Sequence, residues 1–563
     1  MISKIDKKKL IIILNCIKKA PYSFTLIISN FISSFLSVAG IPLIIFAYQY
    51  SQNENKDTLP YNEKLKYIFE LIHIDLNFYS LLSLALILII LGQTCLGLIE
   101  LGNRYVHIKV VKESSINLIK YFKDANWIKI LNDKSGKFQY SINNESLSSA
   151  QMILDSLRFS SSTIQIVFYM ITSLYFSLKL TSILLFFFIL MGLITIVVSS
   201  KINLLSNFFN LGRIKIAESI SNISNNKKYI KSSSIPLYFE NLYKEIEETW
   251  KFNWKLNLIG GILVYSLFIF TVFVFSALLV FHNELDTSFE EVTITILIFL
   301  RTTPVFLKLS QSYSSLNENI PPHQNFIKRL SLFKHNKEKN GKNKFIPNSI
   351  IKFKNVSFKY PGAKKNVISN LNLEIKPKKS YALVGKSGSG KTTVIDMILG
   401  LIRPTFGNIY YGKTDHKNLD FSSLREKISY ISQNISLFDG TIKENILMGK
   451  KKSLKKIINV SKSSLAYDFI KKMPKQFNTK LGENGLKISG GQKQRILLTR
   501  ALISDSSIII LDEATNQLDS FTSGHIKKTI EKLRKIKTII IISHDKNIEK
   551  KVDKTFIIKK NYK

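Results

Sequence analysis

Long apolar stretches alternate with charged segments over the first half of the chain. A membrane-spanning helix needs about 20 predominantly apolar residues, and five stretches reach this length between bounding charges. A buried helix of a globular protein rarely stays uncharged for so long. We therefore predict five spans, at about residues 22–48, 77–101, 157–178, 180–202 and 256–282.

A sixth span is predicted at about residues 290–314, although this stretch carries Arg301, Pro304 and Lys308. Six spans would return the chain to the side of the membrane from which it started. A cation inside a span is costly unless it faces a wet cavity or a partner. Arg301 is therefore either a cation on a substrate path or a structural side chain that pairs or reaches toward the interface. Both interpretations stay open.

The charged segments between the spans predict how the chain is oriented. Residues 283–291 contain four acidic residues and no basic one, whereas residues 103–156 and 201–255 are rich in lysine and arginine. Because positively charged loops stay on the cytoplasmic side, we expect these two long segments and both termini to be cytoplasmic. The lysines that flank the apolar stretch before residue 20 predict an interfacial lead-in helix rather than a cleaved signal peptide.

The two basic segments are too long to be simple connections. Their polar, periodic character predicts that the flanking helices continue past the bilayer, with turns near Asn126-Trp127 and near residues 232–236. The pair Pro321-Pro322 is expected to end the sixth helix. Residues 334–348 form a charged linker with few apolar residues.

From residue 349 onward, short β-rich runs alternate with turns and helical patterns, which is typical of an α/β fold. The predicted organisation is an α-helical six-span membrane domain over residues 1–333, the linker over 334–348, and an α/β P-loop NTPase domain over 349–563.

Composition narrows the range of functions. The 563 residues include 80 basic and 40 acidic side chains, giving a formal net charge of +40. Lysine is spread along the whole chain and no dense basic stripe with interleaved aromatic residues is present, so we do not expect nucleic-acid binding. The two cysteines, Cys16 and Cys95, lie in or beside apolar stretches, which excludes a disulfide framework and a zinc site.

A phosphate-binding loop follows the apolar run at residues 381–384, which is typical of a buried strand, and precedes a helical pattern at 393–399. Glycines let backbone N–H groups surround phosphates, and the helix N-terminus favours an anion. We expect Lys391 to reach the β- and γ-phosphates and Thr392 to hold Mg²⁺. The residues predicted to contact the nucleotide here are Gly385, Lys386, Ser387, Gly388, Ser389, Gly390, Lys391, Thr392 and Thr393.

Two further elements downstream belong with this loop. The apolar run at residues 508–511 ends in Asp512 and Glu513. An acidic residue at the end of a strand beside a P-loop holds Mg²⁺, which assigns Asp512 to the metal, and Glu513 is placed to accept a proton from an attacking water. The second element is a glycine pair that opens another predicted helix and offers more N–H donors to an anion. It consists of Ser489, Gly490, Gly491 and Gln492.

With these motifs in this order, the chain resembles the ATP-binding cassette (ABC) family. The segment Ile488–Gln492 resembles the family's signature motif, with isoleucine in place of the usual leucine. The resemblance implies that Tyr360 stacks on adenine and that Gln433 contacts Mg²⁺ and the water. It also implies that His544 contacts the γ-phosphate as a catalytic residue and that Asp519 makes a dimer contact. Asn516-Gln517 departs from the family pattern beside Asp519, so the local dimer contacts are less well defined.

The resemblance also implies an assembly. In this family two cassettes pack head to tail, and each ATP lies between the P-loop of one and the signature motif of the other. One cassette and six spans make half of such a unit. The cofactors implied are ATP and Mg²⁺, the partner is a second copy of the chain in a homodimer, and the location is the cytoplasmic (inner) membrane among its lipids.

The leading functional prediction is an ATP-hydrolysing exporter or flippase that works by alternating access. The cassette around Gln433 and Gly482–Gly485 looks similar to bacterial flippases of lipid-linked oligosaccharides, and also to lipid and drug exporters. We predict a lipid, a lipid-linked saccharide or another amphipathic substrate, whose anionic head group Arg301 would meet. The alternatives are an ATP-gated channel or regulator and a multidrug or peptide exporter. A soluble ATPase acting on DNA or ribosomes is disfavoured by the five clean spans.

Overall fold

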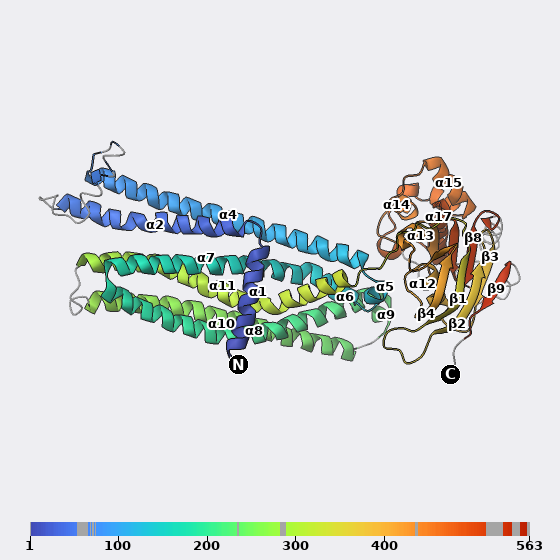
Figure 1. The fold of residues 1–563 in the computed structure, drawn as a ribbon, viewed down its shortest axis with the longest axis horizontal. Helices are drawn as coiled ribbons and strands as arrows, with labels where there is room; N and C mark the ends of the chain where they lie inside the picture. The colour runs from blue at the N-terminus through green and yellow to red at the C-terminus, as the bar shows by residue number, and fades with distance from the viewer. Residues whose placement is uncertain are drawn as a thin grey trace. The chain divides into compact units, whose positions relative to one another are not determined.

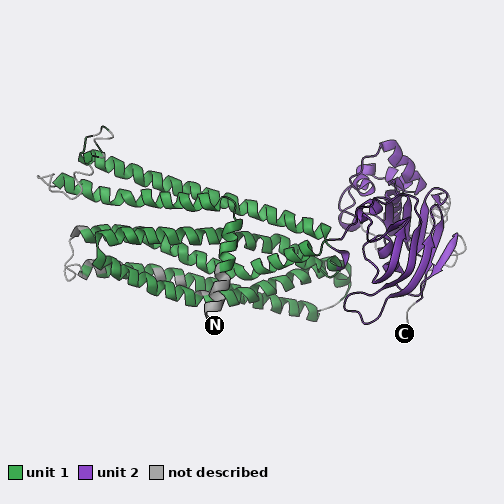
Figure 2. Cartoon of the chain, in the orientation of Figure 1, with its two compact units in different colours: residues 1–125, 129–337 green, residues 126–128, 338–563 purple. Residues whose placement is uncertain are grey.

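The computed structural model describes residues 2–52, 66–67, 69, 73, 75–233, 236–281, 289–433, 437–513, 533–542 and 552–559. The chain divides into two compact units, residues 1–125 with 129–337 and residues 126–128 with 338–563 (Figure 2). The division after Lys337 falls inside the stretch predicted as a linker. The exact limits of the two predicted domains stay predictions.

The first unit, called the membrane unit below, is helical (Figure 1). Its helices α2 and α4 pack along each other, and α7, α8, α10 and α11 form a second group. The short helix α1 runs across the long ones. The described helices are α1 (Ile2–Lys19), α2 (Ser23–Gln52), α4 (Phe78–Asp124), α5 (Trp127–Leu131), α6 (Ser135–Tyr140), α7 (Ser146–Phe176), α8 (Leu178–Asn225), α9 (Lys227–Ser232), α10 (Pro236–Phe281) and α11 (Phe289–His335).

Five of these helices, α2, α4, α8, α10 and α11, are long and apolar enough to cross a membrane. The third predicted span, at residues 157–178, lies on α7, which is not among the five. Its uncharged part still carries many hydroxyl side chains, and several of them are buried, including Ser161, Ser162 and Ser173. The described residues therefore support a helical membrane unit, but six spans are not confirmed.

The long helices exceed the length needed to cross a bilayer. Helix α4 has 47 residues and α8 has 48, against about 20 for a span. Helix α4 ends at Asp124, α5 begins at Trp127, and α10 begins at Pro236, where a proline loses no intrahelical hydrogen bond. These breaks lie where the two polar turns were predicted.

The prediction that Pro321 and Pro322 end the sixth helix is wrong, because α11 continues to His335. A proline leaves the carbonyl four residues earlier without a helical donor. Those two carbonyls accept hydrogen bonds from α8 instead: Asn203 Nδ2 donates to Asn317 O at 2.9 Å and Ser206 Oγ donates to Glu318 O at 2.5 Å. Beyond the prolines, burial of Phe326 and Phe333 stabilises the extension.

The second unit, called the nucleotide unit below, has two sheets. The antiparallel sheet has the order β2-β1-β4-β5 and the parallel sheet the order β6-β7-β8-β3-β9. Every residue of β3, β7 and β8 is buried, as expected for parallel strands covered on both faces. The strands are β1 (Ile351–Phe358), β2 (Ile368–Ile375), β3 (Ser380–Val384), β4 (Phe406–Tyr411), β5 (Thr414–Asp415), β6 (Ile428–Ile431), β7 (Ile508–Asp512), β8 (Thr538–Ile542) and β9 (Lys554–Ile557).

Six α-helices of this unit complete the α/β architecture: α12 (Lys391–Ile398), α13 (Phe421–Glu426), α14 (Ile442–Leu447), α15 (Leu454–Ser463), α16 (Tyr467–Lys471) and α17 (Gly490–Ile503). Two hydrophobic cores hold them. One lies around α12 and both sheets, and the other lies around α14, α15 and α17. Trp127 and Ile128 pack against the first core, which explains why residues 126–128 group with this unit.

Candidate functional site

The predicted phosphate-binding loop connects β3 to α12. At Gly385, an added Cβ would lie 2.4 Å from the carbonyl oxygen of Ile558, so only glycine allows the two backbones to approach so closely. Gly390 is the residue before α12 and has φ +99°, a left-handed conformation that glycine adopts without strain. The conformation of the loop therefore requires glycine at both of its ends.

Lys391 begins α12 and is buried, with 8% of its surface exposed. Its ammonium donates to the loop carbonyls of Gly385 at 2.7 Å and Lys386 at 3.3 Å. These bonds hold the cation inside the ring of the loop. A phosphate placed at the N-terminus of α12 would therefore meet a positioned positive charge and the helix dipole together.

Ser389, in the same loop, shows that the loop has unused hydrogen-bonding capacity. Its side chain is 1% exposed, and its hydroxyl has no partner within the part of the chain that the structure describes. A buried hydroxyl without a partner costs free energy, and a phosphate oxygen would satisfy it. Thr392, next to the buried Lys391, is exposed, so its hydroxyl is accessible to a metal ion. These features fit a nucleotide phosphate.

Asp512 lies at the carboxyl end of β7 and is 6% exposed. The hydroxyl of Tyr430 on β6 donates to its carboxylate at 3.1 Å. Burial raises the pKa of Asp512, although the Tyr430 hydrogen bond opposes this rise. Burial and the nearby Asp512 also raise the pKa of Asp396, on α12, to about 6. A buried and a half-buried carboxylate that repel each other are a suitable environment for Mg²⁺, which would neutralise their repulsion.

Glu513 and Gln433 meet in the structure. Gln433 Nε2 donates to Glu513 Oε2 at 2.9 Å. Glu513 has φ +51°, which is unusual for a residue with a side chain, and its backbone N–H donates to Ile542 O at 3.0 Å. This bond to β8 fixes the backbone so that the carboxylate leaves the end of β7 beside Asp512.

The glycine pair Gly490-Gly491 begins helix α17, as predicted. Ser489 caps the helix: its hydroxyl accepts from Gln492 N at 3.3 Å, and Gln492 Oε1 accepts from Ser489 N at 3.1 Å. This capping box leaves the amides of Gly490 and Gly491 at the helix start. Ile488 belongs to the second core, whereas the P-loop helix belongs to the first.

Tyr360 lies beside the P-loop. Its hydroxyl is 3.3 Å from Thr393 Oγ1, and its ring contacts Phe358 edge-on with centroids 4.9 Å apart. The structure thus brings Tyr360 to the predicted nucleotide site. The predicted residues Asp519 and His544 lie outside the described residues, and their roles stay predictions.

Two residues of this site were missed by the sequence analysis, Tyr430 and Asp396. The signal available was weak: Tyr430 lies three residues before Gln433 on an apolar strand, and Asp396 is a lone charge on an apolar helix. Tyr430 reaches Asp512 because β6 pairs with β7, and Asp396 of α12 interacts electrostatically with the same carboxylate.

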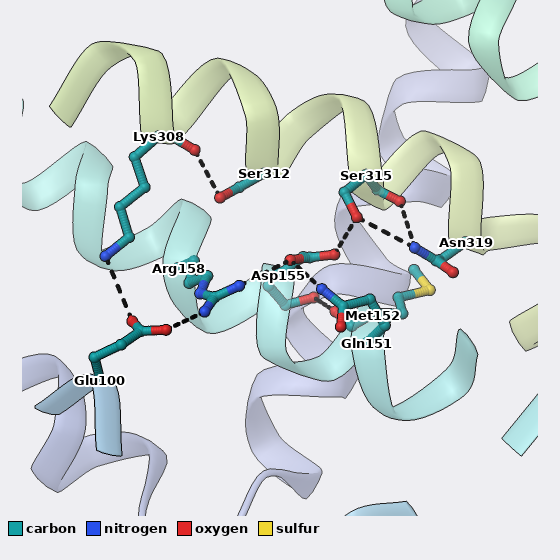
Figure 3. A network of polar contacts seen from close by, with 10 residues as sticks. Glu100, Gln151, Met152, Asp155, Arg158, Lys308, Ser312, Ser315 and Asn319 are labelled. Atoms are coloured by element: carbon teal, nitrogen blue, oxygen red, sulfur yellow. Dashed lines mark hydrogen bonds and ion pairs between the residues drawn. The ribbon is translucent and has the colours of Figure 1, made fainter. Parts of the chain in front are cut away.

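In the membrane unit, the structure joins charges that the sequence left separate (Figure 3). Lys308 Nζ on α11 lies 3.8 Å from Glu100 on α4, and Arg158 on α7 pairs with the same carboxylate. Arg158 also lies 4.0 Å from Asp155, which accepts a hydrogen bond from Ser315. Lys308 is thus a paired side chain.

Arg301, the predicted substrate-path cation, is half-buried on α11. No ion pair to it is found among the residues that the structure describes. Its role on a substrate path stays a prediction.

Comparisons with known proteins agree with this geometry. Residues 368–516 match the family model described as ABC transporter. The chain is 42% identical over 195 residues to an uncharacterized ABC transporter ATP-binding protein of Sinorhizobium fredii, covering 34% of this chain and 33% of that protein. It is 34% identical over 290 residues to an ATP-dependent lipid A-core flippase of Wigglesworthia glossinidia brevipalpis, covering 50% of each. The matches thus span half or less of these relatives.

Among solved structures, the chain is similar to a bacterial Atm1-family ABC exporter with ATP bound. The TM-score is 0.79 at 18% identity, and the match covers 95% of this chain and 94% of that one. This similarity extends over both units and shows the fold. Residues 368–516 therefore carry an ABC transporter domain, and the chain as a whole has the fold of a solved ABC exporter.

Proposed function

We propose that the protein is an ATP-driven exporter or flippase that moves an amphipathic substrate out of or across the cytoplasmic membrane. The observation that carries this proposal is the ABC nucleotide site on the same chain as helices apolar enough to span a membrane. The similarity to lipid A-core flippases supports a lipid or lipid-linked saccharide as substrate.

In this proposal the P-loop holds the phosphates of ATP. Lys391 and the loop amides contact the β- and γ-phosphates, and the Ser389 hydroxyl donates to a phosphate oxygen. Mg²⁺, when bound by Thr392, Asp512 and Gln433, neutralises charge that develops on the phosphates. The phenol of Tyr360 lies at the edge of the loop, where its ring supports the adenine.

Hydrolysis then depends on Glu513 and Gln433. The contact between their side chains places a carboxylate and an amide where a water can be oriented. Glu513 accepts a proton from this water while the water oxygen attacks the γ-phosphorus. The bond between the γ-phosphorus and the bridging oxygen breaks, and this oxygen leaves with ADP. His544 contacts the γ-phosphate in this proposal.

The active unit is a homodimer. The amides at the start of α17 and the Ser489 side chain are expected to complete the ATP site of the partner subunit, and Asp519 contacts that partner. Because Trp127 and Ile128 pack on the same core as the P-loop helix, movement of the nucleotide unit can pass to the ends of α4 and α5. Both termini and the nucleotide unit are cytoplasmic in this arrangement.

The proposal is tested with purified protein reconstituted into vesicles, using Glu513→Gln. We expect ATP hydrolysis to fall at least about a hundredfold while ATP binding persists, as for loss of one essential catalytic group. ATP turnover near the wild-type level would show that Glu513 is not the base.

Transport is tested separately from hydrolysis. Inverted membrane vesicles should accumulate a fluorescent lipid-linked probe against its gradient only with ATP, and Glu513→Gln should abolish this uptake. Movement of the probe only down its gradient would instead identify an ATP-gated channel.

Arg301→Ala should weaken transport of an anionic substrate, and unchanged transport would remove Arg301 from the substrate path.

A further inference from the structure

The membrane unit contains a cavity of about 500 Å³ that the nucleotide site does not use. Its walls come from four helices, α1, α4, α7 and α11, all within this unit. Helix α1, which contributes Ile12, Asn15, Cys16 and Lys19 to the lining, crosses the long helices (Figure 1). A volume of this size is in the range of small-molecule sites.

One side of the cavity is apolar. Val110, Ile153 and Phe326 line it and are buried, and Ile12 of α1 lies against the same cluster. Val110 and Ile153 also belong to the core that fixes α1 on the bundle, so this wall is a packed surface. It offers hydrocarbon contact to a ligand.

The other side is polar and already organised. The ring of His323 on α11 is 2.9 Å from Ser149 Oγ on α7, and its other nitrogen is 4.0 Å from Cys16 Sγ on α1. This chain of contacts joins three helices across the cavity. Asn15, also lining the cavity, is exposed and adds an amide on the side of α1.

The charges that line the cavity favour an anion. Lys19 and Lys328 line it together with Glu113, which leaves one positive charge in excess. Neither lysine has an ion-pair partner in the described ranges of the chain. Burial raises the pKa of the Cys16 thiol to about 11, and Lys19 is close enough to oppose this rise. Lys19 thus lines the cavity together with Cys16, which contacts His323.

The level of the cavity relative to the membrane follows from the chain around α1. The spanning helix α2 begins at Ser23, four residues after Lys19. With both termini cytoplasmic, as proposed above, α1 lies at the level of the head groups of the cytoplasmic leaflet, where lysines meet lipid phosphates.

We propose that this cavity binds the head group of an acidic phospholipid from the cytoplasmic leaflet. The phosphate lies at Lys19, and the glycerol and first methylene groups lie against Ile12 and Ile153. This inference uses the proposed orientation of the chain but not its transport activity. Soluble phosphate esters share the head-group chemistry, so the test separates the two sources.

The experiment is native mass spectrometry of the full-length protein in detergent after delipidation. Phosphatidylglycerol, phosphatidylcholine and glycerol 1-phosphate are titrated in turn. We expect phosphatidylglycerol to bind at least about fivefold more tightly than phosphatidylcholine, with glycerol 1-phosphate far weaker. Equal binding of both lipids would overturn the proposal, and so would glycerol 1-phosphate binding as tightly as phosphatidylglycerol.

Matched variants locate the bound lipid. Lys19→Gln should lose the preference for phosphatidylglycerol, whereas Lys18→Gln, which removes the same charge outside the cavity, should keep it. An equal loss in both variants would indicate attraction to a charged surface and would exclude the cavity.

A second pair of variants tests the cavity by size. Asn15→Trp should fill the side formed by α1 and block binding, whereas Leu14→Trp, on the exposed side of α1, should leave it intact. The melting temperature of each variant is measured first, so that lost binding is interpreted only in folded protein. A folded Asn15→Trp protein that binds phosphatidylglycerol normally would contradict the proposal.

Discussion

The two units each contain a cluster of polar side chains around a buried aspartate, and the two clusters differ in what balances their charges. In the membrane unit, Asp155 accepts from Gln151 at 2.9 Å and from Ser315, and Arg158 joins it to Glu100 (Figure 3). In the nucleotide unit, the Ser389 hydroxyl has no described partner, and the carboxylate of buried Asp512 repels that of half-buried Asp396.

This difference separates a cluster that stabilises helix packing from one that is prepared for a ligand. Carboxylates held near each other without a cation are destabilising, so a protein that keeps them gains from the cation that neutralises them. In the membrane cluster the charges pair with one another, although Arg158 Nε has no described hydrogen-bond partner. The nucleotide cluster needs phosphate and a divalent cation.

The largest effect is expected when Lys391, the cation of the nucleotide site, is removed. Lys391→Ala should lower ATP hydrolysis by roughly 10² to 10³-fold, because a preorganised charge on the transferred phosphate is lost. The measurement is steady-state phosphate release. Lys413→Ala, an exposed lysine between β4 and β5, should leave the rate within about twofold.

The next largest effect, on the free energy of unfolding, is expected when Asp155 is removed from the membrane cluster. Asp155→Ala should lower the unfolding free energy by about 3 kcal/mol, because Arg158, Gln151 and Ser315 lose a shared buried partner. Thermal unfolding in detergent measures it. Asp124→Ala removes a pair between half-buried Asp124 and exposed Lys337 and should cost less than about 1 kcal/mol. Equal losses of unfolding free energy in the two variants would contradict the larger contribution expected of the buried Asp155.

A smaller effect sharpens the role of Tyr430. Tyr430→Phe removes the donor that orients Asp512, and the Mg²⁺ concentration for half-maximal hydrolysis should rise about tenfold. Mn²⁺ binding to the ADP complex, measured by electron paramagnetic resonance, should weaken in parallel. Tyr410→Phe, on the antiparallel sheet, serves as the control. A lower maximal rate with an unchanged Mg²⁺ concentration for half-maximal hydrolysis would contradict the proposal that Tyr430 orients Asp512 toward the metal.

The smallest effect concerns pH and a group away from both clusters. Burial lowers the pKa of His416, which is 3% exposed and accepts from Ile409 N at 3.3 Å. A lowered folded pKa means that the neutral ring is favoured in the folded state, so its stabilisation is complete above pH 6.5 and is lost as pH falls below it. His416→Gln should flatten the decline in melting temperature between pH 7 and 5. An unchanged slope would contradict this assignment.

Local sequence was sufficient to predict much of the nucleotide site. The left-handed φ of Gly390 is a requirement within the loop, whereas Gly385 is required by the approach of the distant Ile558 backbone, and the glycine-rich motif marks both positions. Asp512 and Glu513 follow an apolar run whose end is clear. Their roles in binding stay predictions, but their placement at the strand end is observed.

The remainder depends on contacts between distant segments. Tyr430 meets Asp512 only because β6 pairs with β7, and Arg158 meets Glu100 only because α7 packs near α4. The helix end predicted at Pro321-Pro322 failed for the same reason. The local rule is sound for an isolated helix, but donors from α8 replace the hydrogen bonds that proline removes.

Those two replacement bonds have a mechanical consequence. Asn203 and Ser206 of α8 can serve the carbonyls of Asn317 and Glu318 in one longitudinal register only. Sliding α11 along α8 by a turn would take both carbonyls away from these donors. The two bonds therefore resist sliding of α11 along α8 during a conformational cycle.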